Sequence, residues 1–159
     1  MRLVVLVGLP ASGKSTWLHD NQLFALSSDA VREMLTGDVT DQSINRLVFQ
    51  TLRQLAAARV RAGVDLTYID STALTPWERR CWIRFGELHD CPVEAVYFDV
   101  PLAECKRRNA LRPRVVPENI LDRMAARLVA PSLAEGFTRV STIADTPTTA
   151  APAQAPERP

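Results

Sequence analysis

A glycine-rich segment near the start of the chain has the residue types and spacing of a phosphate-binding loop. Residues 8–15 read GLPASGKS, which fits the pattern G-x-x-x-x-G-K-[ST] at every fixed position. Glycine permits backbone angles that a Cβ would forbid, so such a loop can close on an anion and offer its amides to phosphate oxygens. We predict that it binds ATP. The residues expected to contact the nucleotide are Gly8, Pro10, Ala11, Ser12, Gly13, Lys14, Ser15 and Thr16.

Two side chains of this loop have further expected roles. Lys14 would reach the β- and γ-phosphates of ATP, and the Ser15 hydroxyl would bind Mg²⁺. A second candidate ligand for Mg²⁺ is Asp70, which ends a later apolar strand, the place of a Walker-B aspartate.

The elements that must position these residues alternate between strands and helices. Apolar runs predict strands, and apolar residues at helical spacing predict the helices. We expect N-caps at Ser28 or Asp29 and at Thr40 or Asp41, and we interpret the aromatic residues of the fourth helix, Trp77 included, as packing residues. The expected strands are residues 3–7, 24–27, 66–70, 93–98 and 137–142, and the expected helices are 16–20, 30–35, 43–62, 77–88, 101–108 and 118–129.

This alternation predicts an α/β fold, a three-layer P-loop NTPase or kinase fold. Its sheet would be five-stranded and mostly parallel, with helices on both faces. Ligands in such folds bind at the carboxyl ends of the strands. The residues that follow the first three strands, namely the phosphate loop, residues 27–29 and residues 70–72, should therefore converge.

Three classes of P-loop protein compete for this sequence. A GTPase normally reads guanine with an [NT]-K-x-D motif, but the chain has only the lysines Lys14 and Lys106, and neither has an aspartate two residues later. A hydrolytic ATPase usually follows its Walker-B aspartate with a glutamate, whereas Asp70 is followed by Ser71. Transfer of a phosphoryl group to an acceptor other than water is the class that these residues favour.

A kinase needs a base near the acceptor hydroxyl and cationic groups around the transferred phosphoryl group. Asp29, placed just after the second strand, is the candidate base. Arg32 lies one helical turn further on and could hold an acceptor phosphate or orient the carboxylate. The alternatives are an N-cap for Asp29 and a solvated surface charge for Arg32.

Three arginines near residue 110 form a second cationic group. Arg108 and Arg112 are four residues apart, and Arg114 follows after a proline. We predict a mobile, arginine-rich lid in which Arg108 contacts the nucleotide and Arg112 and Arg114 neutralise charge on the γ-phosphoryl oxygens. The alternative is a solvated basic loop.

Composition indicates the class of partner, the redox state of the cysteines and the cellular location that we expect. The net charge is +1, so overall charge points to no class of partner, and three cysteines without C-x-x-C spacing favour reduced thiols. No apolar stretch is long enough to span a bilayer, and the amino terminus lacks a signal-peptide pattern, so we expect a cytoplasmic protein without a membrane partner. We expect a kinase domain over residues 1–142 and a disordered Pro/Ala/Thr-rich tail over 143–159. The sequence does not predict the oligomeric state.

Several segments together resemble one family, the polynucleotide 5′-kinases of nucleic-acid end repair. They are GLPASGKST at 8–16, SSDAVR at 27–32, residues 40–42, residues 70–72, and residues 108–112 through 135–137. The resemblance extends in order to about Val140. It departs from the family after Asp70, where Ala73 stands in place of an asparagine.

The resemblance implies ATP-dependent phosphorylation of the 5′-hydroxyl of DNA or RNA. It implies that Lys14 and Ser15 serve ATP and Mg²⁺, that Asp29 is the general base, that Arg32 contacts the phosphate of the acceptor, and that Arg112 and Arg114 are the lid arginines. Two alternatives stay open: a small-molecule or zeta-toxin-like kinase with a small hydroxyl acceptor, and a nucleotide-binding module without transfer activity.

Overall fold

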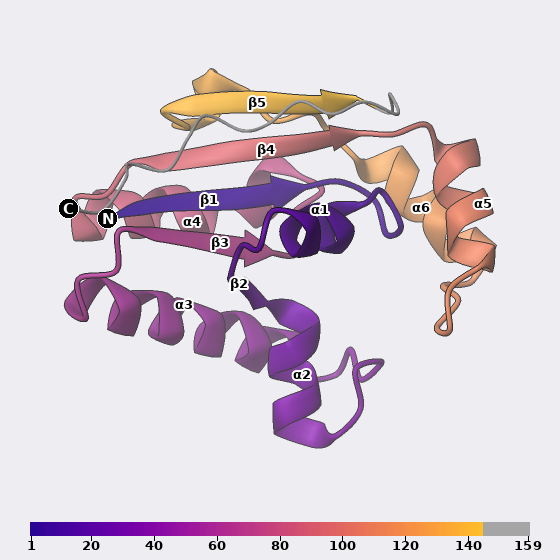
Figure 1. Cartoon of the computed structure of the whole chain (residues 1–159), viewed down its shortest axis with the longest axis horizontal. Coiled ribbons are helices and arrows are strands. Elements are labelled where there is room, and N and C mark those ends of the chain that lie inside the picture. Colours follow the sequence, from indigo (N-terminus) through magenta and orange to yellow (C-terminus); the bar gives the residue numbers. More distant parts are fainter. Residues whose placement is uncertain (145–159) are drawn as a thin grey trace.

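The computed structural model describes residues 1–144, and within them five strands form one parallel sheet in the order β2-β3-β1-β4-β5 (Figure 1). The predicted tail lies outside these residues, apart from its first two positions. Strand β1 is central, and Asp70 of β3 is level with Leu6 of β1 on one side and Ser27 of β2 on the other. The strands are β1 (Arg2–Val7), β2 (Ala25–Ser27), β3 (Leu66–Asp70), β4 (Val93–Asp99) and β5 (Arg139–Ala144).

Helices cover both faces of the sheet and its carboxyl edge. Helices α2 (Ser28–Thr36), α3 (Asn45–Arg61) and α4 (Pro76–His89) pack on one face, and α1 (Lys14–Asp20) packs on the other. Helices α5 (Leu102–Ala110) and α6 (Glu118–Arg127) lie beyond the carboxyl end of β4 (Figure 1). A short 3-10 helix, η1 (Leu133–Glu135), precedes β5. The predicted α/β fold is confirmed.

The apolar run of β1 is buried on both faces of the sheet, as its sequence predicted. Leu3 and Val5 pack with residues of α3 and α4, whereas Val4 and Leu6 pack against Leu18 of α1. Burial of each such side chain stabilises the fold by about 1.5–3 kcal/mol. This central strand therefore holds the phosphate loop that follows it on a rigid support.

Several predicted element ends were wrong, and local hydrogen bonds explain them. The N-cap of α2 is Ser27, whose hydroxyl accepts from the Ala30 amide at 3.4 Å, rather than Ser28 or Asp29. Thr40 and Asp41 do not cap α3. The Asp41 carboxylate instead accepts from the Ser43 amide at 2.9 Å, and the helix begins later, at Asn45. Strand β5 runs to Ala144, past the expected end at residue 142.

One expected packing residue of α4 is a surface residue. Trp82 is fully buried and Phe85 nearly so, as predicted, but Trp77 is 80% exposed. The helix begins at Pro76, so Trp77 occupies its first turn, whereas the other two aromatic side chains belong to the hydrophobic core.

A buried arginine fixes the segment that follows β3. Arg79 of α4 is fully buried and donates from Nε and Nη2 to the two carboxylate oxygens of Glu135, at 2.8 and 2.7 Å. Its Nη1 donates to the carbonyls of Ala73, Leu74 and Val129 at 2.9, 3.2 and 3.0 Å. Arg79 thus ties the loop after Asp70 to the segment that connects α6 with η1.

Removal of this guanidinium should destabilise the protein strongly, because it leaves the Glu135 carboxylate and three carbonyls without their donor. We expect Arg79→Met to lower the free energy of unfolding by about 3–5 kcal/mol in urea denaturation. Arg80→Met, at an exposed neighbouring position, should change it by less than about 0.5 kcal/mol. Equal losses in the two variants would show that the Arg79 contacts contribute little.

Candidate active site

The phosphate loop connects β1 to α1 and has the backbone that its glycines predict. A Cβ on Gly8 would lie 2.9 Å from the Ser12 hydroxyl and 3.0 Å from the Phe98 Cβ, so only glycine fits there. Gly13 has a φ of 96° and caps α1, whose first amides have no acceptor within the helix. The residues that carry those amides line the cleft described below, where such amides can bind an anion.

Lys14 is buried in the loop that it belongs to. Its Nζ donates to the carbonyls of Gly8 and Leu9 at 2.9 and 2.7 Å, and to the Ser12 hydroxyl at 3.4 Å. Burial lowers the pKa of Lys14 to about 8, and the nearby Asp70 carboxylate opposes that shift. The ammonium is therefore already positioned inside the phosphate cradle.

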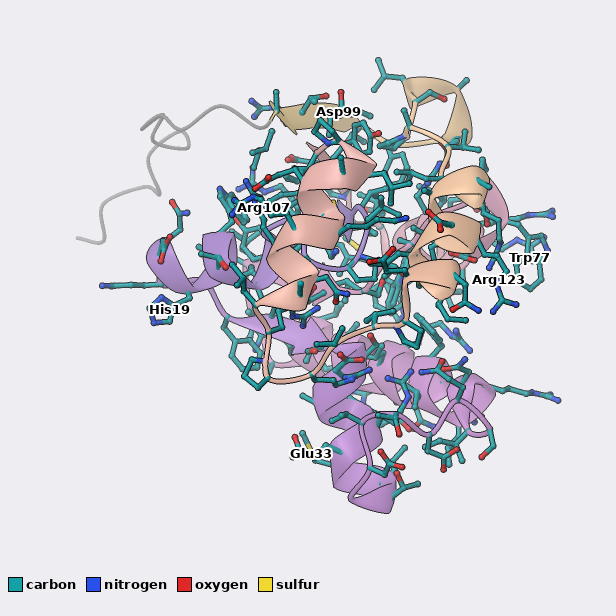
Figure 2. All side chains as sticks on the ribbon, turned by 90° about the vertical axis from the view of Figure 1, so that its right-hand side faces the viewer. His19, Glu33, Trp77, Asp99, Arg107 and Arg123 are labelled. Atoms are coloured by element: carbon teal, nitrogen blue, oxygen red, sulfur yellow. The ribbon has the colours of Figure 1, made fainter. Side chains whose placement is uncertain are left out.

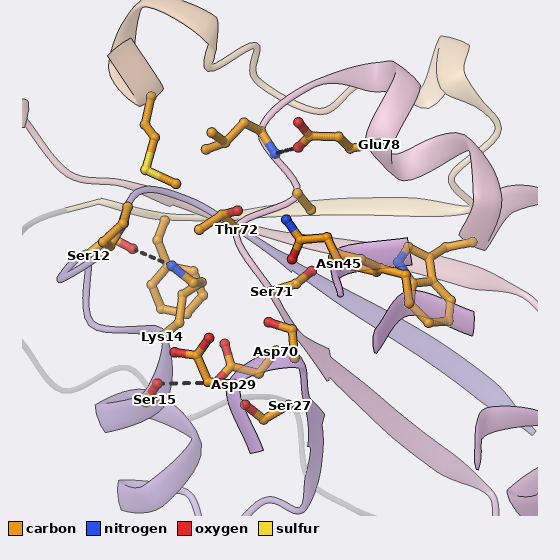
Figure 3. Close-up of a pocket in the computed structure, with 18 of the residues that line it drawn as sticks. Ser12, Lys14, Ser15, Ser27, Asp29, Asn45, Asp70, Ser71, Thr72 and Glu78 are labelled. Carbon is orange, nitrogen blue, oxygen red and sulfur yellow. Dashed lines mark hydrogen bonds between the residues drawn. The ribbon is translucent and has the colours of Figure 1, made fainter. Parts of the chain in front are cut away.

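The two candidate magnesium ligands are in contact. The Ser15 hydroxyl donates to Asp70 Oδ2 at 3.1 Å (Figure 3). Burial raises the pKa of the Asp70 carboxyl, and Lys14 opposes the shift. Within residues 1–144 no group of three or more His, Cys, Asp and Glu side chains could hold a metal. This donor set still fits Mg²⁺ in a nucleotide site, where one hydroxyl, a carboxylate, phosphates and water share the coordination.

Asp29 lies beside the phosphate cradle on the same side of the sheet. Figure 3 shows its carboxylate between Lys14 and Asp70. Arg32 Nη1 donates to its Oδ1 at 2.8 Å, and Arg114 Nη1 donates to its Oδ2 at 3.1 Å. The three strand ends therefore converge as predicted, and the Asp29 carboxylate is held from two sides.

Arg32 is a buried residue and not the solvated surface charge of the alternative interpretation. Its side chain is 4% exposed, and Nη2 donates to Asn45 Oδ1 at 2.7 Å. Asn45 is the first residue of α3, a position that the sequence did not single out. Its only signal in the sequence is a polar residue at a predicted helix start.

The lid arginines occupy the end of α5 and the loop after it. Arg108 lies near the phosphate loop, since its Nη1 would be 3.8 Å from a Cβ on Gly13, and its Nε donates to Glu104 at 2.6 Å. Arg112 is close enough to Lys14 to lower the pKa of that amine further. The loop is fastened at its base by Asn109, whose side-chain amide exchanges two hydrogen bonds with the Val116 backbone, at 2.8 and 3.0 Å.

Most of these residues line one cleft of about 2160 Å³, and Gly8, which was also expected to contact the nucleotide, is not among its lining residues. The lining residues include Lys14, Ser15, Asp29, Arg32, Asn45, Asp70, Arg108, Arg112 and Arg114. Figure 2 views the molecule from the carboxyl edge of the sheet, where α5 and α6 lie in front. Pro10, Ala11, Ser12 and Thr16, expected to contact the nucleotide, also line the cleft. So does Ser71, which belongs to the segment 70–72 expected at this edge of the sheet but was given no role of its own. The structure thus gathers the predicted site residues, while their roles stay predictions.

Comparison with known proteins gives a family match over most of the chain. The model of the AAA domain family matches residues 3–131. One curated relative, the bifunctional polynucleotide phosphatase/kinase of Schizosaccharomyces pombe, is 25% identical over 148 residues. That match covers 89% of this chain, which spans only about a third (33%) of the length of the relative.

Solved structures share the fold. One is the Pnkp1/Rnl/Hen1 RNA repair complex, at a TM-score of 0.67 and 15% identity over 80% of this chain and 43% of that one. Another is a sugar kinase from Janibacter sp. HTCC2649, at a TM-score of 0.60 and 24% identity over 91% and 84% of the two chains. At these identities the likeness concerns the fold alone.

None of the helices in residues 1–144 has the length and apolar character that a membrane-spanning helix needs.

The lowered pKa of Lys14 predicts pH-dependent nucleotide binding. With a pKa of about 8 in the free protein, the amine is mostly charged at pH 7 and mostly neutral at pH 9, so the apparent affinity for ATP should fall roughly tenfold between these values. Isothermal titration calorimetry at pH 7 and pH 9 measures this apparent affinity for ATP. Lys14→Ala should bind more weakly and lose this pH dependence. An affinity that stays constant in the unmodified protein would contradict the expectation.

Proposed function

The chain belongs to the AAA domain family, and on that premise we propose that it is an ATP- and Mg²⁺-dependent kinase that phosphorylates the 5′-hydroxyl of a polynucleotide. The family match and the similarity to a polynucleotide phosphatase/kinase together support the resemblance to polynucleotide 5′-kinase-like P-loop kinases. The observation that carries the proposal is the position of Asp29, whose carboxylate shares the cleft with Lys14, Ser15 and Asp70.

In this proposal the phosphate loop holds the nucleotide. The amides at the start of α1 and the Lys14 ammonium bind the β- and γ-phosphate oxygens. Ser15 and Asp70 would hold Mg²⁺, which would supply positive charge that neutralises the phosphate oxygens. Lys14 already lies in the loop, where its ammonium donates to three loop oxygens. Phosphate oxygens would replace at least one of these acceptors when the nucleotide binds.

Asp29 acts on the acceptor. Its carboxylate would orient the 5′-hydroxyl toward the γ-phosphorus and accept the hydroxyl proton as the new O–P bond forms. The bond between the γ-phosphorus and the β-phosphate oxygen would break in the same step, and ADP would leave with that oxygen. The hydrogen bonds from Arg32 and Arg114 fix the carboxylate in one orientation, which favours an in-line approach. One of the two guanidinium groups can turn to the acceptor phosphate without leaving Asp29 unpaired.

The lid arginines would surround the transferred group. Arg108 is placed beside the phosphate loop, and Arg112 is placed near Lys14. Guanidinium groups in these positions stabilise the charge that spreads over the γ-phosphoryl oxygens. The packing of Leu9 in the phosphate loop with Cys105 of α5 anchors the helix that carries Arg108.

Two observations favour a polynucleotide over a small acceptor. The sequence similarity to a polynucleotide phosphatase/kinase covers nearly all of this chain. The cleft, at about 2160 Å³, is also larger than the roughly 300–1,000 Å³ that small ligands usually occupy. A nucleotide and the end of a chain can therefore be accommodated together.

The direct experiment is incubation with γ-labelled ATP, Mg²⁺ and a panel of acceptors. The panel contains DNA and RNA oligonucleotides with 5′-hydroxyl ends, the same oligonucleotides with 5′-phosphate ends, and small sugars. Label should appear only on the 5′-hydroxyl oligonucleotides. Label on a sugar alone would support the small-molecule alternative, and ATP binding without transfer to any acceptor would support the non-catalytic one.

Loss of the Asp29 carboxylate should remove transfer while leaving nucleotide binding almost intact, because this group acts on the acceptor. We expect Asp29→Asn to lower kcat by roughly 10²–10⁴-fold with an ATP affinity within about twofold. The matched control is Glu33→Gln, an exposed position on the same helix outside the cleft. Turnover in Asp29→Asn equal to that of the control would remove Asp29 from the mechanism.

A further inference from the structure

The cleft continues beyond the proposed reacting groups, between helices α3 and α4. Its walls there carry Arg46 and Arg53 from α3 and Arg80 and Arg84 from α4, and we call this part of the cleft the arginine groove. The spacing explains the arrangement, because residues seven apart on α3 and four apart on α4 lie on one face of their helix. Burial raises the pKa of the Cys81 thiol in α4, and the nearby Arg53 of α3 opposes that shift, which places the two helix walls close together.

The arginine groove has an excess of positive charge. Helix α3 contains arginines but no aspartate or glutamate, and within the described residues none of the four groove arginines forms an ion pair. The one acidic residue of α4 that lines the cleft, Glu78, already accepts from Arg127 at 2.6 Å and from the Leu74 amide at 2.7 Å. Guanidinium groups without a carboxylate partner in this arrangement fit phosphate groups.

Two buried polar atoms lie where the groove meets the candidate active site. Arg32 Nε and the Ser71 hydroxyl are the buried side-chain atoms that lack a hydrogen-bond partner among the described residues. Arg32 is 4% exposed and Ser71 5%, and both line the cleft. A buried donor without a partner costs free energy that a bound ligand can recover. Both atoms therefore fit the first polar groups of an acceptor that extends into the groove.

An exposed indole stands at the same wall. Trp77 is 80% exposed, lines the cleft, and lies three and seven residues before Arg80 and Arg84 on α4. An aromatic side chain beside a row of basic residues is the arrangement that binds single strands, in which bases stack on the ring and phosphates meet the cations. A duplex keeps its base faces inside its own stack, so this arrangement favours a single strand.

We propose that the arginine groove and Trp77 bind the single-stranded part of a polynucleotide whose 5′ end lies at Asp29. This inference deepens the proposed function and rests on it for the position of the 5′ end. Arg32 and Ser71 receive the end of the strand, the four arginines bind successive phosphates, and Trp77 stacks on a base. The groove thereby selects long acceptors over mononucleotides.

The test measures binding of a fluorescein-labelled single-stranded 5′-hydroxyl 20-mer by anisotropy at several salt concentrations. Removal of two phosphate contacts in Arg53→Gln/Arg84→Gln should reduce the slope of log affinity against log salt by roughly 1.4, at about 0.7 for each phosphate. The control Arg61→Gln/Arg139→Gln removes the same charge at exposed positions outside the cleft and should keep the full slope. Equal slopes in the two variants would overturn the proposal.

The indole gives an independent readout. Trp77→Ala should weaken binding of the 20-mer roughly 5- to 150-fold, and Trp77→Phe should restore part of the loss, because phenylalanine also stacks. Trp77→Ala with unchanged affinity would overturn the stacking role. All of these positions are exposed or partly exposed, so every variant is expected to keep the fold. Thermal unfolding of each variant checks this.

Together, these experiments distinguish failure of the groove proposal from failure of the proposed kinase function. If the unmodified protein labels oligonucleotides but its groove variants bind like the control, the groove proposal fails and the proposed function stands. If the groove arginines set the salt slope but no oligonucleotide is ever labelled, the proposed function fails and the groove is an established single-strand site.

Discussion

The parallel pairing of β1, β2 and β3 is the constraint on which the site depends. In this register Leu6, Ser27 and Asp70 are level, so the segments after these three strands leave the sheet at the same edge. A slip of one residue would turn Asp70 to the opposite face of the sheet and away from Ser15. The register is held by the apolar side chains of β1, which are buried on both faces and cannot be exposed without a large loss of stability.

Charge balance explains why several charged side chains can lie close together in the candidate active site. Lys14 is buried with Asp70 close by, and each opposes the shift that burial imposes on the pKa of the other. Asp29 is neutralised by Arg32 from its own helix and by Arg114 from the lid loop. In the proposed function a bound triphosphate would add negative charge to this site, and the lid arginines would supply positive charge that balances it.

Much of this arrangement could be predicted from the sequence. The phosphate loop is local, so its pattern specifies its geometry, and the rule that ligands bind at strand ends brought Asp29 and Asp70 to it. Contacts between distant segments could not be predicted. Nothing in the sequence near Arg79 indicates that it pairs with Glu135. Trp77 was predicted to pack in the interior, and the structure shows that it is exposed. The predicted start of a helix was wrong where a short polar side chain forms a turn instead of a helix cap, as at Asp41.

The most direct test of the site is a crystal structure with a non-hydrolysable ATP analogue, Mg²⁺ and a 5′-hydroxyl dinucleotide. The geometry predicts the γ-phosphate between Lys14 and the lid arginines, with an oxygen of Asp29 within about 2.6–3.2 Å of the 5′-hydroxyl and that hydroxyl in line with the phosphorus. An acceptor hydroxyl bound away from Asp29, with that carboxylate still held only by Arg32 and Arg114, would contradict the assignment of this site to phosphoryl transfer.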